Sequence, residues 1–201
     1  MITSYKEYRH YVRADIAAYG LRSVSLYNWL RIDQLRFQLR LRRLEYLANC
    51  RPWRVVSRAV LEVLNHRLAL RLGFTVPKNV FGPGLCLVHR GTVVVSPLAK
   101  VGANCRIHPS TSIGDYNGAP TLGDNVYIGP GAKLYGPVTI GDNVAVGANA
   151  VVNTSFPADC TVGGVPARIL SHTGALEQGV FPASPPAPLR LERGVDSTIN
   201  D

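Results

Sequence analysis

The chain has 201 residues, of which 46% are hydrophobic and 17% are charged, a composition typical of a globular protein and not of a disordered one. No apolar run approaches the ~18 residues that a membrane span needs, and the first residues lack the apolar core of a secretory signal. The net charge of +9 lies in the N-terminal third, because residues 1–73 hold 14 Lys and Arg against 5 Asp and Glu, whereas residues 74–201 hold 8 against 8.

The four cysteines show neither a CxxC motif nor metal-ligand spacing: Cys50, Cys86, Cys105 and Cys160. Small buried thiols in a reducing compartment are the simplest interpretation. We therefore expect a cytoplasmic protein without a metal site.

The first 73 residues predict a small α-helical region. A helix is expected over 4–19, with Ser4 as its N-cap and Gly20 at its end, a second over 26–48, and a third over 54–72 that stops at Gly73. In the third helix one apolar stripe is expected to face the core, made of Val56, Val60, Val63, Leu64, Leu68 and Leu72.

The arginine-rich segment 31–58 has several open interpretations. The default is a solvated helix face whose arginine stems cover apolar surface. A peripheral contact with the anionic inner membrane is a second, and attraction of an acidic polysaccharide is a third. Nucleic acid is not favoured, because no recognition motif accompanies the charge.

A short period governs the rest of the chain. An aliphatic residue opens each six-residue unit at Val101, Ile107, Ile113, Leu122, Ile128, Leu134, Ile140, Val146 and Val152. The period runs back through Val93, Leu87, Phe81 and Thr75, giving thirteen openers. Units this short suit a strand and a tight corner, so three units form one triangular coil, and the pattern predicts a solenoid of a little over four coils.

Two breaks interrupt this period. Two extra residues are expected near Ser96–Lys100 and three near Tyr116–Thr121. Loops on a rigid scaffold tend to carry function. After Leu170 the periodicity ends, so we divide the chain into a basic helical region over 1–73, a β-solenoid over 74–171 and a mobile tail over 172–201.

The repeat resembles that of left-handed parallel β-helix acyltransferases, and the closing stretch GGVPARIL over 163–170 is close to the end of the serine acetyltransferase family. The resemblance covers about residues 74–171 and implies a mainly β fold, with acetyl-CoA as co-substrate in an O-acetyl transfer. It maps the family's general base onto His89, which follows the opener Leu87 by two residues. A neutral imidazole is available near pH 7.

Several charged residues of the family are missing here. Val88 stands where the family has an Asp before the base, Phe74 where it has another Asp, and Gly118-Ala119-Pro120 where it has Arg-His-Pro. Without those charges we expect no strong binding of zwitterionic serine, because its buried charges would lack partners and this is costly. Asp115 or a backbone carbonyl is the expected partner that orients the base.

We therefore expect a saccharide acceptor: a hydroxyl of a bacterial capsule or exopolysaccharide, or of its acidic or lipid-linked precursor. The resemblance includes a subgroup of capsule and exopolysaccharide acetyltransferases. His108, Tyr116 and Asn117 are the expected acceptor contacts. Serine as acceptor is the alternative, and a non-catalytic scaffold is a further one.

The resemblance also places the pantetheine arm of acetyl-CoA in a groove between adjacent coils. The expected contacts are Gly131, Ala132, Lys133, Gly147, Ala148, Ala150, Pro166 and Arg168, with Lys133 and Arg168 available for phosphates. It implies a homotrimer with the active site between two subunits.

Overall fold

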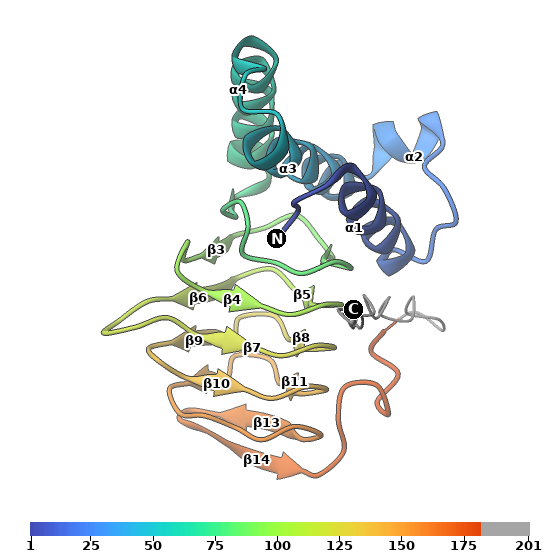
Figure 1. The fold of residues 1–201 in the computed structure, drawn as a ribbon. Coiled ribbons are helices and arrows are strands. Elements are labelled where there is room, and N and C mark those ends of the chain that lie inside the picture. The colour runs from blue at the N-terminus through green and yellow to red at the C-terminus, as the bar shows by residue number, and fades with distance from the viewer. Residues whose placement is uncertain (182–201) are drawn as a thin grey trace, which may run out of the picture.

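The computed structural model describes residues 1–181, and residues 182–201 of the predicted tail lie outside the described part. Four helices sit on one end of a stack of short strands (Figure 1). The two layers follow the predicted order, with helices before Gly73 and strands from Phe74 onwards.

The helical layer contains α1 (Tyr5–Ala18), α2 (Leu26–Arg31), α3 (Asp33–Cys50) and α4 (Val55–Leu72). Ser4 caps α1 by accepting a hydrogen bond from the Glu7 amide, and Gly73, at φ 79°, ends α4. The single helix predicted over 26–48 is divided at Ile32, whose φ of −99° and ψ of 81° are not helical.

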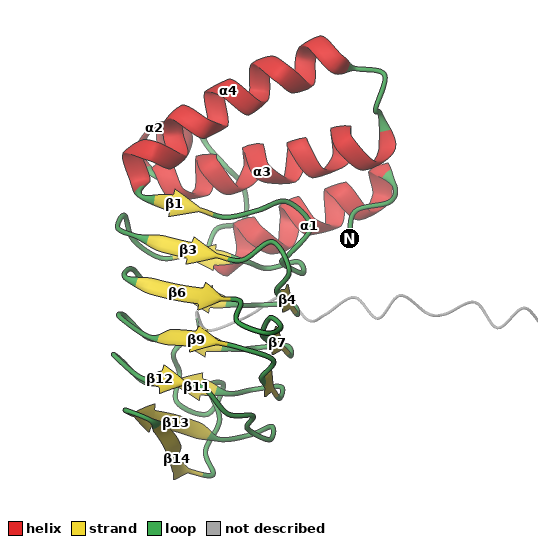
Figure 2. Ribbon diagram, turned by 90° about the vertical axis from the view of Figure 1, so that its left-hand side faces the viewer, coloured by secondary structure: helices red, strands yellow, loops and turns green. Residues whose placement is uncertain are grey.

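The solenoid is a parallel β-helix with three faces, which confirms the predicted fold class. The first sheet stacks β1, β3, β6, β9 and β12 (Figure 2), the second stacks β4, β7 and β10, and the third stacks β2, β5, β8, β11, β13 and β14. The strand bounds are β1 (Phe74–Thr75), β2 (Cys86–Leu87), β3 (Val93–Val95), β4 (Lys100–Val101), β5 (Arg106–Ile107), β6 (Thr111–Gly114), β7 (Thr121–Leu122), β8 (Tyr127–Ile128), β9 (Lys133–Tyr135), β10 (Thr139–Ile140), β11 (Ala145–Val146), β12 (Val151–Val152), β13 (Thr161–Gly164) and β14 (Ala167–Ser171).

Inward side chains fill the β-helix almost as the period predicts. The openers from Phe81 to Val152 are all buried, and together they build one continuous apolar core. The opener predicted at Val93 is wrong, because Val93 pairs with Thr111 whereas Val95 pairs with the opener Ile113. Thr75 is the exception: it is exposed, and Phe74 points inward in its place. Bridges at Phe81 and Phe156 complete the second sheet at both ends, within the predicted extent of 74–171.

The register moves the first break to a different corner. Leu87 pairs with Ile107 and Val95 with Ile113. Leu87 and Val95 are eight residues apart along the chain, whereas their partners Ile107 and Ile113 are six apart. The two extra residues therefore lie within His89–Thr92. The predicted position near Ser96–Lys100 is wrong, and the enlarged corner is the one that carries His89.

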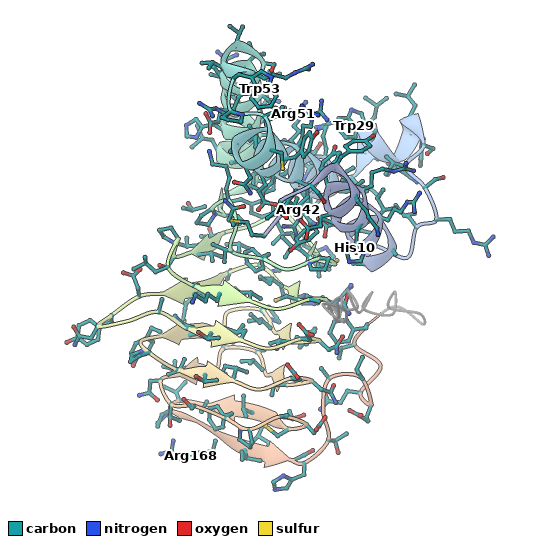
Figure 3. The ribbon with its side chains drawn as sticks, viewed as in Figure 1. His10, Trp29, Arg42, Arg51, Trp53 and Arg168 are labelled. Carbon is teal, nitrogen blue, oxygen red and sulfur yellow. The ribbon has the colours of Figure 1, made fainter. Side chains whose placement is uncertain are left out.

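A buried ionic cluster joins the helices to the first coil. Arg42 on α3 is fully buried, and its guanidinium donates to Asp15 at 2.8 Å, to Glu45 at 3.1 Å and to the carbonyl of Phe81 at 2.9 Å. Burial opposes the charge on Arg42, but the carboxylates of Asp15 and Glu45 raise its pKa above the ordinary value. Figure 3 shows Arg42 at the junction between the two layers.

Side chains of the helical layer also cover the free edge of the third sheet at β2. Gln38 donates to the Leu85 carbonyl at 2.6 Å and accepts from the Leu87 amide at 2.8 Å, while the Tyr19 hydroxyl donates to the Leu87 carbonyl at 2.8 Å. These bonds replace the missing strand above β2, and an unpaired strand edge would otherwise be an aggregation risk.

The outer face of α4 differs from the prediction. Val56, Val60, Val63 and Leu64 are 78%, 55%, 53% and 43% exposed, and only Leu68 and Leu72 of the predicted stripe are buried. α4 instead rests on the layer below through the face that includes Leu61, Asn65, Leu68 and Leu72. In the part of the chain that the structure describes, no helix is long and apolar enough to span a membrane.

The start of the predicted tail packs on the β-helix. Ala175 is fully buried, its amide donates to the Asn143 carbonyl at 3.2 Å, and the Leu176 amide donates to the Asn143 side chain at 2.8 Å. Residues 172–177 therefore extend the structured part beyond the expected boundary at 171.

Candidate active site

One edge of the β-helix carries the predicted base. At this edge the third sheet passes into the first sheet, and we call it the histidine edge; successive coils place there His89, His108, Gly129–Gly131 and Gly147–Ala148. A ladder of backbone hydrogen bonds fixes the order: Val88 N donates to Ile107 O, His108 N to Ile128 O, and Gly129 N to Val146 O.

His89 is exposed in the enlarged corner. The neighbouring Arg90 is held by Asp33 at 2.5 Å, and the carboxylate of Asp33 also binds Arg36, so the corner is tied to the start of α3. Within residues 1–181, His89 has no recorded hydrogen bond to a side chain or carbonyl that would orient its ring. The ring of His89 is therefore positioned by its corner and by its contact with His108.

His108 is the aromatic neighbour of His89. The two ring centroids lie 5.9 Å apart with planes at 66°, and Tyr127 on the next coil lies 5.1 Å from His108 on its other side. Burial, then the charges of Arg106 and His89, lowers the pKa of His108 below its ordinary value. These effects favour the neutral form of His108 beside His89.

Tyr116 and Asn117 lie on a different edge from the two histidines. They belong to the three-residue excursion between β6 and β7, where the first sheet passes into the second, and the strand β6 separates them from His108. Asp115, the predicted orienting carboxylate, lies on that same edge. Within one chain the structure brings His108 to His89 and leaves these three residues apart.

The predicted acetyl-CoA contacts fall into three groups. Gly131, Gly147 and Ala148 lie on the histidine edge, on the coils beyond His108. Ala132 and Ala150 point inward and are fully buried. The Lys133 ammonium donates to the Ser110 carbonyl, while Pro166 and Arg168 are exposed at the β13–β14 hairpin, where Figure 3 shows Arg168 at the end farthest from the helices.

Two further features of this region escaped the sequence reasoning. A cavity of about 490 Å³ opens beside the histidine edge between α1 and the third sheet, and Val88 and Arg106 line it. The sequence could have indicated Arg106. It precedes His108 by two residues, so its side chain points outward on the same side as that of His108.

No cluster of three His, Cys, Asp or Glu side chains that could hold a metal ion occurs among residues 1–181. The four cysteines are free thiols. Burial raises the pKa of Cys86 to about 11, which keeps this thiol protonated at neutral pH.

Comparisons with known proteins agree with this architecture. The family model "Bacterial transferase hexapeptide (six repeats)" matches residues 119–154. A serine acetyltransferase of Synechococcus elongatus is 34% identical over 118 residues, which cover 56% of this chain and 48% of the relative. The chain thus spans about half the length of the curated relatives it matches.

Solved structures extend the likeness to the helical layer. Serine acetyltransferase from Brucella abortus superposes with a TM-score of 0.68 at 27% identity, covering 85% of this chain and 71% of that one. The soybean enzyme complexed with serine gives a TM-score of 0.67 at 27% identity, covering 82% and 70%.

The predicted saccharide acceptor is wrong, since these relatives by sequence and by structure are serine acetyltransferases. The prediction treated each missing family charge as a lost contact with serine. In the structure Phe74 packs against Phe37, with ring centroids 5.3 Å apart, at the interface between the layers. The chain carries the hexapeptide-repeat transferase pattern in its β-helix, and its homologues are serine acetyltransferases.

Proposed function

We propose that this chain is an O-acetyltransferase that moves an acetyl group from acetyl-CoA to the hydroxyl of serine. The observation that carries the proposal is the histidine edge, where an exposed imidazole on an enlarged corner lies beside a second, neutral imidazole. Serine bound to the soybean relative supports the choice of acceptor.

In the proposed reaction neutral His89 takes the proton of the serine hydroxyl as its oxygen attacks the thioester carbonyl. The new C–O bond forms, the C–S bond breaks, and the proton passes from His89 to the CoA thiolate. A thioester is already activated, so no covalent enzyme intermediate is needed. Juxtaposition of the two substrates at one edge supplies much of the rate.

The donor is proposed to lie along the histidine edge beyond His108. Gly131, Gly147 and Ala148 offer small side chains and backbone groups there. Ala132 and Ala150 contribute only by keeping the adjacent backbone in place, since their side chains are in the core. Pro166, Arg168 and Lys133 are left for the distal parts of CoA.

A homotrimer is part of the proposal. Tyr116 and Asn117 lie on another edge of the same chain, so they reach the acceptor only if a second copy presents its excursion to the histidine edge. Packing of the prisms side by side would do this, and it would put each site between two subunits.

The cytoplasm, where acetyl-CoA is available, is the proposed location, with a peripheral contact to an anionic membrane surface through α4. The outer face of this helix exposes Val56, Val60, Val63 and Leu70. Residues 51–72 hold five arginines against one acidic residue, Glu62, and Glu62 is paired with Lys78. An exposed apolar stripe flanked by arginines matches the interface of anionic lipids.

The test is release of the CoA thiol from acetyl-CoA with L-serine as acceptor. Wild type should turn over, and His89→Ala should lower kcat about 100-fold or more. His66→Ala is the matched control, because His66 is exposed on α4, and it should match wild type. Absence of turnover together with absence of acetyl-CoA binding by calorimetry would favour the scaffold.

A further inference from the structure

We propose that Arg106 binds the carboxylate of the acceptor, in the cavity beside the histidine edge. This inference rests on the proposed function. It names the residue that replaces the charged serine contacts missing from this chain.

Among residues 1–181, Arg106 has no acidic partner. The ion pairs formed within residues 1–181 involve Arg36, Arg42, Arg90 and Lys78, and none includes Arg106. Its recorded polar contact in this part of the chain is from Nη1 to the Cys86 sulfur at 3.4 Å. A thiol is a weak acceptor, so most hydrogen-bond donors of the half-buried guanidinium remain available.

The guanidinium lies at a cavity. Ala18 and Tyr19 at the end of α1, Cys86 and Val88 on the first coil, and Phe181 form walls of this space of about 490 Å³. Ligand pockets begin at about 300 Å³, so an amino acid has room here.

The cavity adjoins the reacting groups. Val88 immediately precedes His89, and Arg106 precedes His108 by two residues on the same outward side of the strand. Register places Arg106 directly between Cys86 and Tyr127 of the adjacent strands. A molecule held by Arg106 therefore extends towards the two imidazoles.

The chemistry fits a small zwitterion. A guanidinium binds a carboxylate through two parallel hydrogen bonds, and charge-assisted bonds of this kind are the strong ones. The carboxyl end of α1 at the same cavity carries partial negative charge, which suits the ammonium group. The hydroxyl of serine is only a few bonds from its carboxylate, so a serine held by Arg106 presents its hydroxyl towards the cavity wall at Val88, the residue before His89.

The experiment compares two acceptors in wild type and in three variants. L-serinamide keeps the hydroxyl and the ammonium of L-serine but has no carboxylate charge. Wild type should have a higher kcat/KM for L-serine than for L-serinamide. Arg106→Gln should raise the KM for L-serine about 10- to 100-fold, because it loses hydrogen bonds to a charged group. The kcat/KM for L-serinamide and the KM for acetyl-CoA should stay within about threefold of wild type.

Arg106→Lys keeps the positive charge and should restore part of the preference for L-serine over L-serinamide. This variant also tests the inference if Arg106→Gln fails to fold. Arg71→Gln removes an exposed arginine of α4 and should leave the preference as in wild type. If Arg106→Gln turns over L-serine with an unchanged preference over L-serinamide, this inference is overturned and the proposed function stands. If wild type turns over neither acceptor, the proposed function fails and this inference fails with it.

Discussion

His89 and His108 lie ring to ring on two successive coils, with centroids 5.9 Å apart and planes at 66°. They are nineteen residues apart in sequence, and the stacking of coils brings them together. The ring of His108 is half-buried between His89 and Tyr127. Its packing supports the corner that carries the proposed base.

The lowered pKa of His108 predicts a pH dependence of stability. Burial, Arg106 and His89 favour its neutral form in the folded chain, whereas the unfolded chain takes up this proton near pH 6.5. The stability that His108 contributes is therefore fully present above about pH 6.5 and is lost as pH falls through that value towards the folded pKa. Urea unfolding between about pH 5 and 8 should show a shallower pH slope for His108→Gln than for wild type. His66→Gln should keep the wild-type slope, and equal slopes for all three proteins would contradict the prediction.

Loss of the buried arginine at the junction should be strongly destabilising. Arg42→Met leaves the carboxylates of Asp15 and Glu45 buried without their cation, which costs about 3–5 kcal/mol. Chemical unfolding followed by circular dichroism would measure this loss. Arg67→Met, at an exposed position of α4, should change the free energy of unfolding by less than about 0.5 kcal/mol. An equally small change for Arg42→Met would show that the cluster of Arg42, Asp15 and Glu45 does not hold the helical layer on the β-helix.

Close stacking of the corners predicts different effects at two glycines. A Cβ on Gly82 would lie 2.7 Å from the carbonyl carbon and oxygen of Gly102, whereas a Cβ on Gly114 meets only the Tyr135 Cβ at 3.9 Å. Gly82→Ala should therefore destabilise the chain by about 1–3 kcal/mol. Gly114→Ala should be neutral or stabilising by up to about 1 kcal/mol. Thermal unfolding of both variants tests this, and equal midpoints would refute the stacking argument.

The outer face of α4 predicts binding to anionic lipid. Wild type should sediment with vesicles that contain phosphatidylglycerol and not with phosphatidylcholine alone, and salt should weaken the binding, because exposed charges are screened. The double variant Val56→Ser, Val60→Ser should lose much of the binding. Leu98→Ser removes an apolar side chain that is 65% exposed on the β-helix and should bind as wild type does. If wild type does not bind vesicles but forms dimers, and the double variant does not form them, this face of α4 instead contacts a second copy of the chain.

The sequence determined the interior of the β-helix. Its period is short and local, so each opener could be placed inward from its neighbours six residues away, and twelve of the thirteen expected openers are buried. Several corners of the coils lie in the left-handed conformation at Asn104, Asn125, Asn143 and Asn149, and asparagine tolerates a positive φ. The helical ends at Ser4 and Gly73 follow the same local chemistry.

Only the tertiary structure decided the position of the enlarged corner and the surroundings of the site. Val93 and Val95 both point inward, and only the pairing of Val95 with Ile113 shows that Val95 is the opener. The sequence shows that the family's charges are missing, but it does not show the cavity beside Arg106. That cavity joins α1, the first two coils and residues 179–181, and contacts over such separations depend on register and packing and not on local pattern. The exposed face of α4 has the same origin, because an apolar stripe in a sequence does not say which side of the helix its neighbours will cover.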